Sequence, residues 1–135
     1  MAVAWVAASL VVLIVAWVAT SAAAQVAGER DIFTVRAIQV DATAINVTDA
    51  REQGLLAGRI SAFWKVIERL VAPEDLERVP QPTAGEVIIM VRDFSISGER
   101  SSAVRYLSEM TVRFHPGPVR ALLRAAGLPF AETVS

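Results

Sequence analysis

The residues that could carry chemistry gather in one stretch of the chain, from Gly98 to Leu123. Among its charged, aromatic and imidazole side chains are those of Glu99, Arg105, Tyr106, Arg113 and His115. Together they could form an active site or a polar binding face. The same stretch also fits a β-strand that runs into a helix, so the two interpretations differ in how they place these side chains.

The chain offers little else for catalysis. It has no cysteine, which excludes disulfides, thiolate metal sites and thiol nucleophiles. A serine nucleophile needs a base and an orienting group, and His115 is the one histidine. The carboxylates are scattered, and no His-x-x-x-His spacing, phosphate loop or dinucleotide fingerprint occurs. We therefore predict no enzyme activity, and no catalytic, cofactor-binding or metal-ligating residue. His115 is interpreted as a helix cap, with a catalytic or metal-binding imidazole as the alternative.

Alternating side chains from Ala103 to Phe114 predict a strand with two different faces. One face carries mainly apolar residues: Val104, Tyr106, Ser108, Met110, Val112 and Phe114. The other carries Arg105, Leu107, Glu109, Thr111 and Arg113. We expect the arginines and Glu109 to form a ladder of salt bridges, or alternatively a polar binding face. Glu99 joins them if a hairpin brings it opposite.

Two elements are expected to precede this strand. Ile32–Val40 predicts a strand that is not an exposed edge, because both faces are apolar. Asp49–Val71 predicts a long helix capped by Thr48 or Asp49. Its apolar stripe consists of Leu56, Ile60, Phe63, Ile67 and Leu70. Two glycines on this helix, Gly54 and Gly58, are interpreted as points where its backbone closely approaches a neighbour, with a G-x-x-x-G dimerisation motif as the alternative.

Shorter elements complete the expected fold. Thr83 and Glu86 have capping-box spacing, which favours a short helix from about Ala84 to Val91, with a buried strand over Val87–Val91 as the alternative. Asp93–Ser101 predicts a strand, followed by a hairpin connection or bulge between Gly98 and Ser102. Pro118 begins a last helix that Gly127 ends. The aromatic residues Phe63, Trp64, Tyr106 and Phe114 are assigned to the core. The fold class is α+β, a small antiparallel sheet of about three strands with the long and C-terminal helices on one face.

The charge distribution divides the chain. None of its 27 charged residues (13 basic, 14 acidic) precedes Glu29. The apolar run from Ala2 to Ala19, with small residues up to the Ala22–Ala24 triplet, predicts a signal peptide cleaved before Gln25. No basic residue precedes the run, and its length approaches a membrane span, so an uncleaved anchor is the alternative. The net charge of −1 argues against a nucleic-acid binder.

Three segments of the sequence resemble a proteobacterial family of exported proteins, the domain-of-unknown-function family numbered two-zero-six-six. They are the segment from Phe33 (FTVRAIQVDATA), the Ala50-Arg51 helix start, and the segment from Asp93 (DFSISGERSSAVRYLSEMTVRFHPGPVRALL). The resemblance covers about residues 32–130. It implies a periplasmic or membrane-associated protein without an assigned activity. Members carry Asn or Asp where His115 stands, and they continue beyond the position of Ser135.

We therefore expect a signal peptide or membrane anchor over residues 1–24, a single α+β domain over 29–130, and a tail over 131–135. The expected function is a non-enzymatic module of the cell envelope that binds or scaffolds a periplasmic protein, without a cofactor. The expected partner is another envelope protein, with membrane contact only through an uncleaved N-terminal segment. The alternatives are an inner-membrane protein held by that segment, or the N-terminal part of a larger protein whose functional region lies beyond Ser135.

Overall fold

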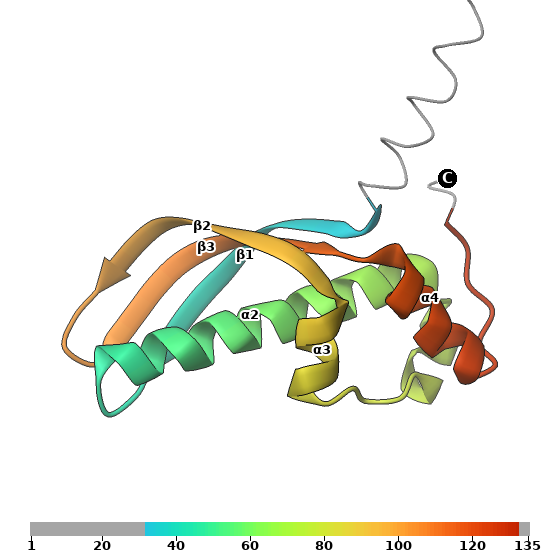
Figure 1. Cartoon of the computed structure of the whole chain (residues 1–135), viewed down its shortest axis with the longest axis horizontal. Helices are drawn as coiled ribbons and strands as arrows, with labels where there is room; N and C mark the ends of the chain where they lie inside the picture. Colours follow the sequence, from blue (N-terminus) through green and yellow to red (C-terminus); the bar gives the residue numbers. More distant parts are fainter. Residues whose placement is uncertain (1–31, 133–135) are drawn as a thin grey trace, which may run out of the picture.

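The computed structural model describes residues 32–132, whose strands form one antiparallel sheet with the helices on one side (Figure 1). The strands are β1 (Thr34–Thr43), β2 (Val91–Ser101) and β3 (Arg105–Phe114), in the order β1-β3-β2. This confirms the predicted α+β class and the three-stranded sheet. The predicted signal peptide or anchor lies outside the described residues, as does the end of the predicted tail.

Strand β3 has the two faces that its alternation predicts. Its inner side chains are buried against the helices: Tyr106, Ser108, Met110, Val112 and Phe114. The outer side chains are exposed or half-buried. Because β3 pairs with a strand on each side, it is the central strand, and its buried face forms the middle of the core.

Strand β1 is an edge strand, so the prediction that it is not an edge was wrong. Its register with β3 shifts between Val35 and Ile38, where Ala37 has a φ of 58°. The bulge lets Val35 and Ile38 both point inward although three positions separate them. Inward-facing apolar residues therefore occupy odd-numbered positions before the bulge and even-numbered positions after it. In the sequence, this pattern resembles a strand that is buried on both faces.

The long helix α2 (Val47–Leu70) begins two residues before the predicted start. Its cap is Asn46, whose side-chain oxygen accepts a hydrogen bond of 2.8 Å from the Asp49 amide. The predicted caps, Thr48 and Asp49, lie inside the first turn. Asn and Asp are about equally good helix caps, so residue type alone does not identify the cap. Which of the neighbouring polar residues caps the helix depends on where the chain leaves β1.

The glycines of α2 face the sheet, as predicted. A Cβ atom at Gly54 would lie 2.8 Å from Val40 Cγ1, and one at Gly58 would lie 2.6 Å from Met110 Sδ. The helix therefore approaches the sheet along its small residues. Of the predicted stripe, Phe63, Ile67 and Leu70 are buried, whereas Leu56 and Ile60 are only half-buried because they lie off this line of contact.

Two short helices follow α2. The segment between α2 and α3 contains a 3-10 helix, η2 (Pro73–Arg78), which was not predicted. The α3 helix (Ala84–Met90) has both halves of the predicted capping box: the Thr83 hydroxyl accepts from the Glu86 amide, and the Glu86 carboxylate accepts from the Thr83 amide. Met90 then leads directly into β2.

The last helix, α4 (Pro116–Ala125), begins at Pro116 rather than at the predicted Pro118. His115 occupies the capping position, but its side chain makes no capping hydrogen bond. Gly127 has a φ of 69°, in agreement with its predicted role as the stop.

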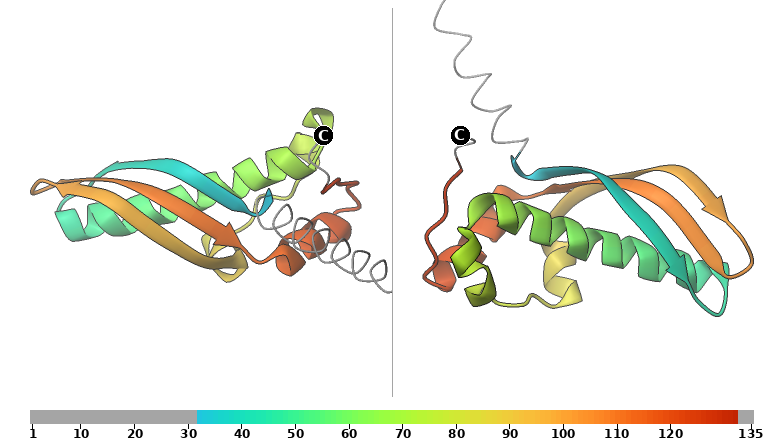
Figure 2. Two further views of the ribbon diagram at one scale, coloured as in Figure 1. Left: turned by 90° about the horizontal axis from the view of Figure 1, so that it is seen from above. Right: turned by 180° about the vertical axis from the view of Figure 1, so that it is seen from behind.

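The layers are unevenly matched. Helix α2 lies across β1 and β3, α3 packs beside α2, and α4 lies at the end of the same layer (Figures 1 and 2). Aromatic rings join the layers, since Phe63 is buried with its ring centroid 5.3 Å from that of Trp64 and 6.5 Å from that of Phe114. Strand β2 receives little cover from α2, and most of its side chains are exposed.

Between residues 32 and 132, no helix combines the length and apolarity that crossing a membrane requires.

Candidate functional site

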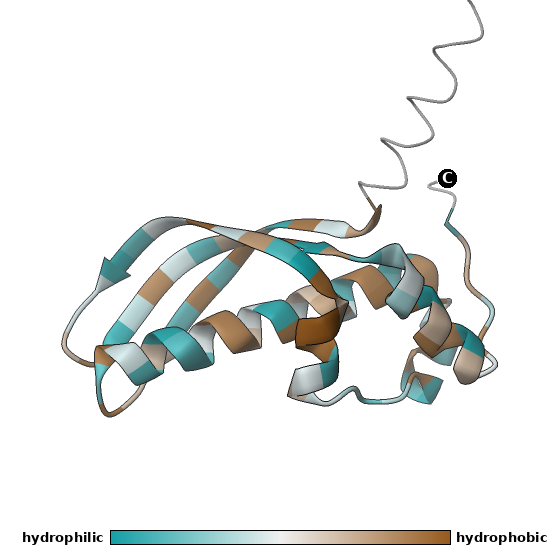
Figure 3. Cartoon of the chain, viewed as in Figure 1, coloured by the Kyte–Doolittle hydropathy of each residue, from teal (hydrophilic) through white to brown (hydrophobic). Residues whose placement is uncertain are grey.

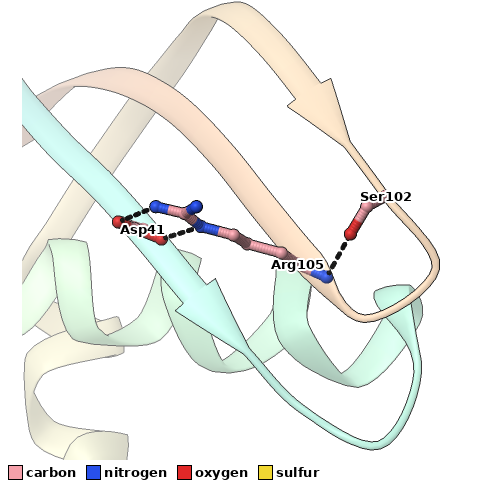
Figure 4. Close-up of polar contacts among 3 residues, drawn as sticks. All are labelled: Asp41, Ser102 and Arg105. Carbon is pink, nitrogen blue, oxygen red and sulfur yellow. Dashed lines mark hydrogen bonds and ion pairs between the residues drawn. The ribbon is translucent and has the colours of Figure 1, made fainter.

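The outer face of the sheet carries the first of the predicted charged residues. Arg105 donates two hydrogen bonds to Asp41 of β1, from Nε to Oδ1 at 2.9 Å and from Nη2 to Oδ2 at 2.7 Å (Figure 4). The Ser102 hydroxyl accepts from the Arg105 amide at 3.1 Å and fixes the turn before β3. The hydrogen bond from Arg105 lowers the pKa of Asp41. This exposed pair is held in a defined geometry.

The other two charges of this face also pair across strands. Arg113 Nη1 lies 3.5 Å from Asp93 Oδ1 on β2, and Gln39 Nε2 of β1 donates to Glu109 Oε2 at 3.1 Å. The arginines and Glu109 therefore do not bridge along β3, since each binds a residue of a neighbouring strand. The sheet's outer face consists of solvated, mutually satisfied polar groups, and it presents no nucleophile beside a base.

Glu99 does not join this face. The register of β2 shifts between Ser97 and Arg100, and Gly98 has a φ of 59°. The bulge turns the Glu99 carboxylate to the helix side of the sheet. There its Oε1 accepts from the Tyr106 hydroxyl at 2.7 Å and lies 3.4 Å from Arg51 Nη2.

The Arg51–Glu99–Tyr106 cluster joins the first turn of α2 to the sheet. The Arg51 guanidinium also lies 5.7 Å from the centroid of the Tyr106 ring. The hydrogen bond from Tyr106 lowers the pKa of Glu99; burial opposes this shift, and Arg51 adds to it. Burial raises the pKa of the Tyr106 phenol. A stable carboxylate and a neutral phenol are structural partners, because neither is poised to exchange a proton near neutral pH.

His115 is separate from these groups. Its imidazole is exposed, and its backbone amide donates to the Met90 carbonyl at 2.8 Å, which ties the end of β3 to the end of α3. In the described part of the chain, no three histidine or carboxylate side chains lie close enough together to hold a metal ion. The side chains of Glu99, Arg105, Tyr106, Arg113 and His115 therefore divide among two faces of the sheet and one junction.

The surface that sequence reasoning missed is apolar. Three of the exposed large hydrophobic residues fall within seven positions, at the passage from α3 to β2: Ile88 is 46%, Ile89 is 73% and Phe94 is 38% exposed. The Arg59 guanidinium of α2 lies 5.0 Å from the centroid of the Phe94 ring. In Figure 3 the apolar part of α3 is visible on the side of the molecule where β2 lacks a covering helix.

We call this surface the α2–α3–β2 face; its residues are Glu52, Leu56, Arg59, Ile88, Ile89 and Phe94. The run Val87–Val91 indicated an apolar helix, and only Val87 and Met90 of that helix are buried. The two adjacent isoleucines between these positions were the available signal, since a seven-residue helix cannot bury all of its sides against one neighbour. The exposure of Phe94 could not be predicted from the sequence, because it depends on where α2 lies relative to β2.

Comparisons with protein-family models, curated proteins and solved structures found no match to this chain. The resemblance described from the sequence therefore stays a prediction, and the geometry of the described residues carries the functional argument.

Proposed function

We propose that this chain is a non-enzymatic interaction module of the bacterial cell envelope, exported to the periplasm, that binds a protein partner through the α2–α3–β2 face. The observation that carries this proposal is the exposure of Ile88, Ile89 and Phe94 beside the uncovered side of β2. Grouped apolar side chains with an aromatic ring and an arginine are typical of protein-binding surfaces.

The polar groups support a binding role rather than a catalytic one. Glu99 and Arg105, which the sequence places near His115, are already engaged: Glu99 accepts a hydrogen bond from Tyr106, and Arg105 pairs with Asp41. A catalytic nucleophile requires a base within hydrogen-bond reach, and a metal site requires converging ligands. The described residues offer neither constellation, which favours binding as the function.

Export is supported by the N-terminal sequence. The apolar run from Ala2 to Ala19 and the small residues up to Ala24 have the composition of a signal peptide and its cleavage site. A single uncleaved span is the second candidate, because the run approaches the roughly 20 residues that cross a bilayer. Both place the residues from Gln25 onward outside the cytoplasm. The proposed kinship with family two-zero-six-six agrees with either location, and with a functional region beyond Ser135 in longer relatives.

The mass of the purified chain distinguishes the two locations. A mature N-terminus near Gln25 in the periplasmic fraction is expected for the cleaved signal. A full-length mass in the membrane fraction would instead establish the tethered form, and cytoplasmic accumulation would overturn both.

A photo-cross-linking amino acid at position 89 tests the binding proposal in living cells. Position 61 is the matched control, because Ser61 is exposed on the far side of α2 from Arg59. Cross-linked adducts of higher mass are expected from position 89 and not from position 61. Equal adducts from both positions, or none from either, would overturn the proposal.

A further inference from the structure

We propose that the α2–α3–β2 face binds a second copy of this chain, with the two α2 helices antiparallel across a two-fold axis beside Leu56. This inference rests on the proposed function, because it names the partner of the same face. The apolar part of the face is exposed, and its charged part is self-complementary.

The charged part lies on one side of α2. Glu52, Leu56 and Arg59 follow at i, i+4 and i+7, so they share one side of the helix. Glu52 is exposed, and Leu56 and Arg59 are half-buried. Arg59 Nε donates to the Leu55 carbonyl at 3.2 Å, and the guanidinium stacks on Phe94. Within residues 32–132, neither Glu52 nor Arg59 has a partner of opposite charge.

A two-fold axis beside Leu56 satisfies both charges at once. In an antiparallel pair of helices, residues at equal distances before and after the axis face each other. Glu52 of each copy then faces Arg59 of the other, and the half-buried Leu56 lies between the two ion pairs. The spacing of seven residues matters, because Glu52 and Arg59 stand about 10 Å apart along one helix and cannot pair within it.

The apolar groups add area on the same side. Helix α3 packs against α2, and Phe94 lies under Arg59, so a helix placed along Leu56 also approaches these neighbours. A face of this modest size indicates a concentration-dependent dimer rather than an obligate one.

Cysteine cross-linking of the full chain tests the axis directly. The chain has no cysteine, so Leu56→Cys introduces a single thiol. Facing Cα atoms of helices packed about 8–10 Å apart come within the roughly 4.4–6.8 Å that a disulfide spans. We expect a disulfide-linked dimer from Leu56→Cys in oxidised envelope fractions. The control, Ser61→Cys on the far side of α2, is expected to remain monomeric.

Charge reversal tests the partner of each side chain. Arg59→Glu and Glu52→Arg each place like charges opposite, so each is expected to weaken the dimer by about threefold to tenfold in sedimentation analysis. The double variant Arg59→Glu/Glu52→Arg restores opposite charges and is expected to recover most of the affinity. The double variant still lacks the Arg59–Phe94 contact within each chain. A recovered dimer affinity would therefore come from the ion pairs between the two copies. Thermal melts of all three variants verify that they fold.

A chain that stays monomeric at high concentration and yields no Leu56→Cys dimer overturns the inference. So does a double variant as weak as the single ones. These outcomes leave the proposed function standing if position 89 still cross-links to a protein of a different mass. If position 89 gives no adduct as well, both proposals fail.

Discussion

Ala37 holds a strained backbone conformation at the bulge of β1. Its φ of 58° lies in the left-handed region, which costs a residue with a Cβ roughly 1–2 kcal/mol. The side chain is exposed, so no packing depends on its methyl group. The strain is therefore the main energetic consequence of having alanine at this position.

Replacing Ala37 with glycine is expected to stabilise the fold by about 1 kcal/mol, because glycine adopts this conformation without the steric cost. Urea unfolding of the full chain measures the effect. Ala57→Gly, at an exposed position inside α2, is the matched control and should destabilise by about 1 kcal/mol. Two changes of the same sign would contradict the bulge geometry.

Glu99 makes stability depend on pH. Its pKa in the folded chain is lowered from 4.5, chiefly by the Tyr106 hydroxyl, so folding favours the ionised carboxylate. The resulting stabilisation is fully present above the unfolded-state pKa and is lost as the pH falls through the folded-state pKa.

We expect Glu99→Gln to lose less of its free energy of unfolding than the unchanged chain when the pH is lowered from neutral to about pH 3. Thermal melts across this range, compared with the unchanged chain, provide the measurement. Asp41 has a lowered pKa as well, through Arg105, so the variant should retain part of the acid sensitivity. An unchanged pH profile would show that the Tyr106–Glu99 hydrogen bond contributes nothing to folding.

At the scale of elements, helix α2 depends on its glycines for its distance from the sheet. A Cβ at Gly54 would lie 2.8 Å from Val40 Cγ1 and 3.0 Å from Ala42 Cβ. The Ala42 Cβ is fixed to its backbone, and the β-branched Val40 side chain is buried and restricted in rotation. At Gly58 the nearest atom is the sulfur of Met110, a flexible side chain that can move.

Gly54→Ala is therefore expected to destabilise the fold by about 1–3 kcal/mol, although alanine is the better helix former. Gly85→Ala serves as the control, because the nearest atom to its added Cβ is 4.0 Å away. It should be neutral or stabilise by about 0.4–1 kcal/mol. Denaturant midpoints compare the two, and a stabilised Gly54→Ala would contradict the close approach.

The elements that the sequence predicted best are those whose signals are local. The alternation of β3 and the capping box at Thr83 involve residues next to one another, and the structure confirms both. The edge position of β1 and the side on which Glu99 lies were predicted wrongly, because each depends on a bulge. After a bulge, every later side chain of the strand points to the opposite face of the sheet from the one that simple alternation predicts. Gly98 marked the bulge beside Glu99 in the sequence, and no comparable residue marked the bulge in β1.

At the scale of the whole molecule, one strand holds the sheet together. Strand β3 is paired on both sides, whereas β1 and β2 each have a free edge. Inner residues of β3 such as Met110 and Val112 are completely buried. Opening β3 therefore requires breaking both ladders and exposing the core.

Amide hydrogen exchange is expected to be slowest in β3, at rates near those of global unfolding. The amides of β2 that point to its free edge should exchange rapidly, while those paired with β3 are protected. Mass spectrometry or NMR of the full chain resolves this alternation. If dimer formation covers β2, its edge amides should slow as the protein concentration rises, and Ser61→Cys should behave like the unchanged chain.

The described chain both enters and leaves the fold at the last turns of α2. Arg69 binds the Ile32 carbonyl, and the Ala131 amide donates to the Leu70 carbonyl. Figure 1 shows both ends together, at the opposite end of the molecule from the β2–β3 turn. A domain with adjacent ends can be carried as a side branch on a longer polypeptide without interrupting its course. The β2–β3 turn, at the other end, would then extend outward from that polypeptide.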